Sequence, residues 1–91
     1  MTKDNCFYLG LITRPNGIKG AVSIYLDVDS PNEYAKMESM FVEINKTLVP
    51  FFIEYLQIRN RGQAVAKLEG VTTEAEAQQM VNMELWLPLT A

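Results

Sequence analysis

The stretch ITRPNGIKGAVSI (residues 12–24) joins a turn to the start of a strand and carries two glycines three residues apart. Arg14–Gly17 fits a type I turn, with Pro at the second position and Gly at the fourth. Beyond it, apolar and polar residues alternate through Ala21–Asp27, as in a strand that is buried on one face. Gly20, just before this strand, suits a bulge or a sharp bend at the corner of a barrel. The buried face of this strand is expected to carry Val22, Ile24 and Leu26.

The rest of the chain contains further short strands separated by turns. Leu48–Ile58 is long and contains a proline, which cannot donate a hydrogen bond to a neighbouring strand, so we expect it to be bulged and bent. Asn60–Gly62 indicates a hairpin turn. On the first strand, Phe7, Leu9 and Leu11 are expected to share one face. The predicted strands are Phe7–Thr13, Ala21–Asp27, Met40–Ile44, Leu48–Ile58, Gln63–Glu69 and Glu84–Leu87.

Two capping-box spacings predict short helices. Ser30 and Glu33 would cap a helix over Pro31–Met37, and Thr73 with Glu76 would cap a second helix. This second helix is predicted over Glu74–Val81 and would end at Asn82 in a left-handed conformation. Six short antiparallel strands with glycine at the corners predict an all-β fold, a small closed six-stranded barrel with two short helical segments.

The composition argues against catalysis and against several kinds of site. A single cysteine, Cys6, and no histidine leave no usual zinc site and no Cys–His nucleophile pair, so we expect no metal, no cofactor and no enzyme. No stretch approaches the roughly 20 apolar residues of a membrane span. The first ten residues lack the apolar core of a signal peptide. These features predict a cytoplasmic protein that does not contact a membrane.

The basic residues are concentrated at two strand connections. Arg14 and Lys19 lie in the first loop, and Arg59 and Arg61 flank the predicted hairpin, so these four are half of the chain's eight basic residues. Because alternate loops of a barrel emerge at the same end, we expect the two pairs to form one patch. The patch is a candidate for phosphate contact on structured RNA, and the alternative is ordinary solvated loop charge.

The two glycines of the first loop also resemble a nucleic-acid clamp. The segment GIKG (residues 17–20) matches the GxxG clamp of KH domains, but that clamp lies between two helices, whereas this one lies between two predicted strands. We therefore interpret Gly17 and Gly20 as turn and bulge residues.

Three aromatic residues fall on the polar side of their strands. Tyr25, Phe41 and Trp86 are predicted to face outward, while Leu85 and Leu87 enter the core. Single exposed aromatics are common on protein surfaces. Three together favour a surface that a partner or a neighbouring domain covers.

Three segments in the same order resemble a known family: FYLGLITRPNGIKGAVSIYLDVDSP (residues 7–31), LVPFFIE (48–54) and AKLEGVTTEAEAQQMVNMELWLP (66–88). They resemble the N-terminal domain of the RimM family of ribosome maturation factors. The resemblance implies a six-stranded barrel similar to the second domain of translation elongation factors. It also implies noncatalytic binding to the immature small ribosomal subunit near its head, and assistance in 16S rRNA processing and 30S maturation. The family usually has His where this chain has Asn16, and an acidic residue where it has Ala21.

The resemblance also implies a domain organisation. In the family a second, PRC-type barrel follows and carries much of the contact with a ribosomal protein of the subunit head. We expect a flexible N-terminus over residues 1–6, the barrel over 7–88, and over 89–91 the start of a linker to a second domain that this chain lacks. We expect a monomer without a small-molecule substrate. The alternative function is a protein-binding barrel that docks on a ribosomal protein without touching RNA.

Overall fold

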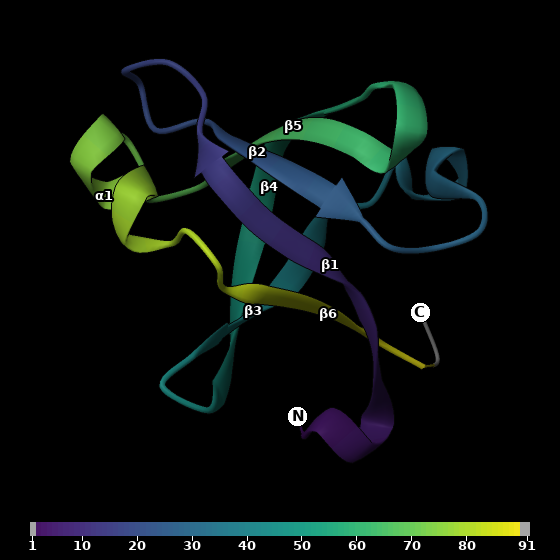
Figure 1. Ribbon diagram of the computed structural model, residues 1–91. Coiled ribbons are helices and arrows are strands. Elements are labelled where there is room, and N and C mark those ends of the chain that lie inside the picture. The colour runs from purple at the N-terminus through teal and green to yellow at the C-terminus, as the bar shows by residue number, and fades with distance from the viewer. Residues whose placement is uncertain (1, 90–91) are drawn as a thin grey trace.

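Six antiparallel strands close into a barrel in the computed structural model, which describes residues 2–89 (Figure 1). Around the barrel the strands follow the order β1-β2-β5-β4-β3-β6, and this confirms the predicted fold class. Three of the strand pairs, β1 with β2, β3 with β4 and β4 with β5, are consecutive in the chain. The strands are β1 (Cys6–Pro15), β2 (Val22–Leu26), β3 (Ser39–Ile44), β4 (Thr47–Ile58), β5 (Gln63–Leu68) and β6 (Glu84–Pro88).

Alternate residues of the strands fill the interior of the barrel. The predicted inward face of β2 is confirmed, because Val22, Ile24 and Leu26 are all buried. On β1 the predicted face is only partly right. Leu9 and Ile12 are fully buried, whereas Leu11 is half-buried. The pairing register of β1 shifts after Tyr8 and again after Ile12. Each shift breaks the two-residue alternation, so the inward face does not follow a simple alternating pattern.

The path of the first loop depends on the backbone conformations of its two glycines. Gly17 and Gly20 have φ of +88° and +94°, in the left-handed region that favours glycine. A Cβ atom on Gly20 would lie 2.1 Å from the carbonyl oxygen of Val71, so the predicted corner is confirmed and also packs against a distant segment. The prediction of a type I turn over Arg14–Gly17 is wrong, because β1 continues through Pro15. The backbone N–H of Asn16 then donates to the Ala21 carbonyl (2.8 Å) and closes the loop.

One of the two predicted capping boxes forms. In α1 (Glu74–Gln79) the Thr73 hydroxyl accepts a hydrogen bond from the Glu76 backbone N–H, and the Glu76 carboxylate accepts one from the Thr73 N–H. The helix ends two residues before the predicted end at Val81, and Asn82 has the expected left-handed conformation (φ 72°).

The other capping box, at Ser30, does not form. Its side chain makes no capping bond, and the segment is a short 3₁₀ turn, η2 (Pro31–Tyr34). Four residues are too few for an N3 side chain to stabilise a helix by reaching back to its cap. Two further 3₁₀ turns are η1 (Lys3–Asn5) and η3 (Asn60–Gly62), the latter at the predicted hairpin.

Candidate nucleic-acid interface

A row of outward-facing side chains crosses four neighbouring strands. Arg14 on β1 is paired with Ser23 on β2, which is paired with Val65 on β5, and Val65 is in turn paired with Gln57 on β4. Residues paired in this way lie side by side on one face of a sheet. The twist of the barrel therefore brings Arg14 toward the end of β4, where Arg59 follows Ile58.

Arg14 and Arg59 line the same shallow hollow, of about 280 Å³. Its other polar lining groups are Asn16, Ser23 and Gln63, and no carboxylate is among its seven lining residues. The Asn16 amide donates to the Ser23 hydroxyl (3.0 Å). The Arg59 guanidinium donates to the side-chain carbonyl of Gln57 (3.1 Å), so one end of the arginine is held while its other N–H groups stay free to donate.

Arg61 extends this basic surface along the hairpin. It lines a second hollow of about 400 Å³, together with Arg59 and one carboxylate, Asp29. Arg61 has a left-handed backbone (φ 61°) at the tip of the hairpin. Arg59 lines both hollows, so Arg14, Arg59 and Arg61 form a continuous strip, called here the arginine strip.

Lys19 lies apart from this strip, so the expectation of a single patch built from all four residues is wrong. The start of β2 (Val22) lies beside Ala66 near the end of β5, while Tyr25 near the end of β2 lies beside Gln63 at the start of β5. The first loop and the β4–β5 hairpin therefore emerge at opposite ends of the barrel (Figure 1). The reason is that three strands, β2, β3 and β4, separate the two loops along the chain, and an odd number of strand crossings leads from one end of the barrel to the other. Arg14 reaches the strip because it lies on β1 itself rather than in the loop.

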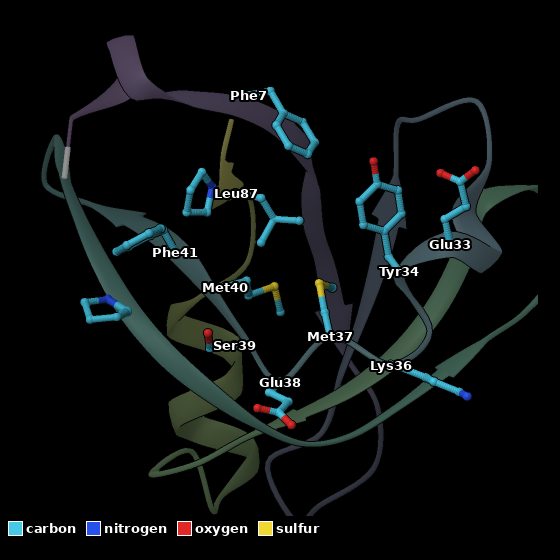
Figure 2. A pocket seen from close by; sticks show the side chains of 12 residues that line it. Phe7, Glu33, Tyr34, Lys36, Met37, Glu38, Ser39, Met40, Phe41 and Leu87 are labelled. Atoms are coloured by element: carbon cyan, nitrogen blue, oxygen red, sulfur yellow. The ribbon is translucent and has the colours of Figure 1, made fainter. Parts of the chain in front are cut away.

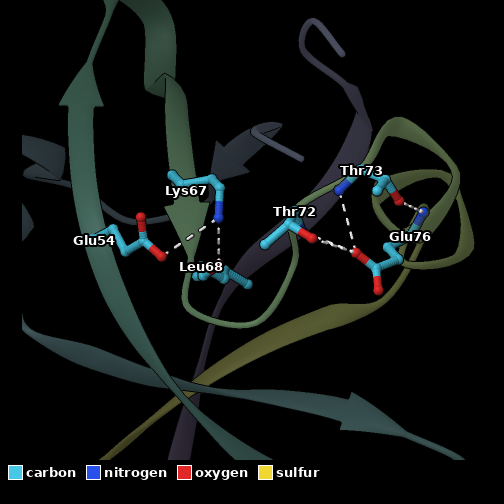
Figure 3. Close-up of polar contacts among 6 residues, drawn as sticks. All are labelled: Glu54, Lys67, Leu68, Thr72, Thr73 and Glu76. Carbon is cyan, nitrogen blue, oxygen red and sulfur yellow. Dashed lines mark hydrogen bonds and ion pairs between the residues drawn. The ribbon is translucent and has the colours of Figure 1, made fainter. Parts of the chain in front are cut away.

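The polar partners of the strip are not apparent from the sequence alone. Ser23 is buried on the outward side of β2, and Gln63 begins β5. Nothing in their local sequence sets them apart, because the cross-strand register decides which side chains surround Arg14. A further cation, Lys67, is buried beside β4. It donates to the Leu68 carbonyl (3.0 Å) and lies 3.5 Å from a Glu54 carboxylate oxygen, so its charge is used within the barrel (Figure 3).

The three aromatic residues predicted to face outward fall into two groups. Trp86 on β6 is paired with Tyr8 on β1 and with Phe41 on β3, which is paired with Pro50 on β4. These four residues form a row across the outside of the barrel, called here the aromatic row. Tyr25, 39% exposed, lies outside the row, on β2 beside the hairpin.

Trp86 faces outward, as predicted, while Leu85 and Leu87 are buried in the core. It is nevertheless half-buried. The Tyr8 ring meets it edge-on at 5.7 Å, and the Lys3 ammonium lies 5.2 Å from its ring centroid. Lys3 also forms an ion pair with Glu43 (2.8 Å). Burial, followed by the negative charges of Glu84 and Asp27, raises the pKa of the Tyr8 hydroxyl.

Among residues 2–89, no three His, Cys, Asp or Glu side chains are placed to hold a metal ion. Over the same residues, no helix is long and apolar enough to cross a membrane.

Together, these observations define a small closed β-barrel domain whose outer face carries an arginine strip and an aromatic row. A family model described as the RimM N-terminal domain matches residues 7–91. The chain therefore belongs to the RimM family, and the resemblance of its sequence motifs is confirmed.

Relatives of known name agree with this assignment. The ribosome maturation factor RimM of Flavobacterium psychrophilum is 46% identical over 89 residues, and that of Flavobacterium johnsoniae is 47% identical over 90 residues. These alignments cover 98% and 99% of this chain but only 51% and 52% of the relatives, so the chain spans about half of their length.

Two solved structures share the fold. The solution structure of the N-terminal domain of RimM from Thermus thermophilus superposes with a TM-score of 0.75 at 20% identity, covering 93% of this chain and 91% of that one. A crystal structure of RimM from Pseudomonas aeruginosa, which is described as a candidate 16S ribosomal RNA processing protein, superposes with a TM-score of 0.81 at 19% identity. It covers 93% of this chain and 51% of that one.

Proposed function

We propose that this barrel is a noncatalytic ribosome-assembly domain that binds precursors of the small ribosomal subunit in the cytoplasm and assists 16S rRNA processing. The relatives of the chain are named ribosome maturation factors, which supports the general role. The observation that supports contact with RNA is the hollow lined by both Arg14 and Arg59. No carboxylate lines this hollow, so nothing there would repel a phosphate group.

The mechanism requires no chemical step. Arginine presents a rigid fork of N–H donors that suits phosphate oxygens. Contacts to phosphates position a protein on RNA without reading its sequence. By binding one conformation of the immature subunit more tightly than others, the domain lowers the free energy of that conformation and shifts the population toward it.

The arginine strip is tested by the salt dependence of binding. Replacing Arg14 and Arg59 with Gln in the 91-residue chain removes two phosphate contacts. It should therefore weaken binding to small-subunit precursors and reduce the slope of log K against log salt by about 2. The control is the double variant Lys19→Gln with Lys46→Gln. Both lysines are exposed and lie outside the strip, and replacing them removes the same amount of charge.

The control variant should keep the wild-type slope. Equal loss of slope in both variants would mean that binding responds only to net charge. An unchanged slope in the Arg14 and Arg59 variant would exclude the strip from RNA contact and favour the protein-docking alternative.

A second proposal concerns the aromatic row. In the relatives, residues that match this chain make up about half of the protein, so the barrel there is one part of a longer chain. We propose that Trp86 and Phe41 contribute to the surface that meets the remaining part, since large half-buried aromatics on an outer face suit a contact of this kind. Tyr25 belongs to this surface only if the contact extends as far as β2.

A further inference from the structure

A groove opens where β3 and β6 stop pairing. The two strands are paired at two positions, Phe41 with Trp86 and Val42 with Leu85. However, β3 begins two residues earlier and β6 continues for two residues more. Beyond these pairs β6 stays beside β1, and β3 diverges from it. The resulting groove, of about 750 Å³, is bordered on its remaining side by residues of the η2–β3 connection.

The floor and walls of the groove are apolar and adaptable. Figure 2 shows Phe7, Met40 and Leu87 around the hollow, with Met37 and Tyr34 on the opposite side. The Phe7 and Tyr34 rings are 6.3 Å apart and tilted at 52°, so they form an aromatic edge to the hollow. Methionine side chains are unbranched and polarisable, and they adjust to ligands of different shape.

The rim of the groove carries more negative than positive charge. Glu33 and Glu38 line it with a single cation, Lys36, and Figure 2 shows Glu33 and Lys36 on the outer side of Tyr34 and Glu38 below Met37. Neither carboxylate is in an ion pair among the described residues, where the ion pairs are those of Lys3 and Lys67. Two carboxylates at the mouth repel a phosphate backbone and attract a cationic side chain.

We propose that this groove binds a short extended segment of a basic partner protein. One or two large apolar side chains of the segment enter between β3 and β6, and a flanking Lys or Arg lies beside Glu33 or Glu38. Apolar anchors in a pocket provide most of the affinity of such contacts, and complementary charge at the rim provides orientation. The groove lies between β3 and β6, whereas the arginine strip runs from Arg14 on β1 across β2 and β5 to the end of β4, and the two share no lining residue. The proposal is therefore independent of RNA binding by the strip.

The test begins with selection from a displayed library of random short peptides against the folded 91-residue chain. Enriched peptides are synthesised and their affinity is measured by fluorescence anisotropy. We expect them to combine a large apolar residue with a neighbouring Lys or Arg. The variant Glu33→Lys with Glu38→Lys should weaken their binding by about tenfold or more, because attraction becomes repulsion.

The matched control is Glu69→Lys with Glu74→Lys, which makes the same change in net charge at exposed positions outside the groove and should leave the affinity unchanged. Met37→Glu places a charge among the apolar lining residues and should abolish binding. All of the substituted positions are exposed or half-buried. Circular dichroism spectra of the variants verify that each one is folded.

Several outcomes would overturn the proposal. These are failure to enrich any peptide, enrichment of peptides without the apolar-basic pattern, and equal losses in the two charge variants. A single-stranded RNA probe whose binding is abolished by Met37→Glu would make the groove a nucleic-acid site instead. None of these outcomes bears on the salt dependence of the arginine strip.

Discussion

Gly20 makes the closest backbone approach in the first loop, and this has a measurable cost on substitution. Gly20→Val adds a Cβ atom 2.1 Å from the Val71 carbonyl oxygen, at a position whose φ is already +94°. We expect a loss of more than about 2 kcal/mol in the free energy of unfolding, because the backbone of one of the two segments must move. Denaturant unfolding of the variant measures this loss.

Gly17 separates the clash from the backbone strain. It has a similar φ of +88° but no atom within 4 Å of an added Cβ, so Gly17→Val should cost only the strain of a left-handed backbone, about 1–2 kcal/mol. Equal losses in the free energy of unfolding for the two variants would show that the clash with the Val71 carbonyl adds nothing to the cost of replacing Gly20.

At the scale of elements, the N-terminus of α1 depends on the ionisation of Glu76. Its carboxylate accepts hydrogen bonds from the Thr72 backbone N–H (2.9 Å), the Thr72 hydroxyl (3.2 Å) and the Thr73 backbone N–H (3.2 Å) (Figure 3). The bonds from Thr72, followed by those from Thr73, lower the pKa of Glu76 below its ordinary value. A lowered pKa in the folded state means that the ionised carboxylate stabilises the fold.

The sign of this effect gives a prediction of pH dependence. The stabilisation is fully present above the ordinary pKa of a glutamate and is lost as the pH falls through the lowered pKa of Glu76. Glu76→Gln should therefore be less stable than the wild type at neutral pH, and the gap should close in acid. Urea unfolding midpoints across this pH range measure the gap. Glu74→Gln, in the same helical turn but outside these bonds, should show no comparable trend. A gap that persists in acid would contradict the role of the charge.

For the whole molecule, the aromatic row predicts a change in the environment of Trp86 when the barrel has its neighbour. Appending the residues that follow the matched region in the Flavobacterium johnsoniae relative should shift the Trp86 emission to the blue and reduce its quenching by acrylamide. Lys3 and Tyr8 already shield part of the indole ring in this chain, so the shift is measured relative to the emission of the 91-residue chain. Phe41→Ser, beside Trp86 on the outer face, should weaken the effect. Unchanged emission in the longer chain would show that the aromatic row lies away from the domain contact.

The strand pattern of this protein could be read from the sequence because it depends on local chemistry. The alternation in β2, the left-handed residue at Asn82 and the capping box at Thr73 each need only a few neighbouring residues, and all are confirmed. The box at Ser30 has the same residue spacing but forms only a 3₁₀ turn. In so short a segment, capping residues cannot offset the cost of nucleating a helix.

The six strands, the corner at Gly20 and the family follow from the sequence, because short alternating segments separated by turns indicate strands, and closure into a barrel removes their unpaired edges. Which charged residues share a surface depends instead on how the strands pair. Arg14 and Arg59 line one hollow across four strands, while Lys19, five residues from Arg14, does not line it. The register shifts of β1 and the divergence of β3 from β6 likewise depend on strand partners far away in the chain. Pairing between distant strands sets these positions, and no local pattern encodes it.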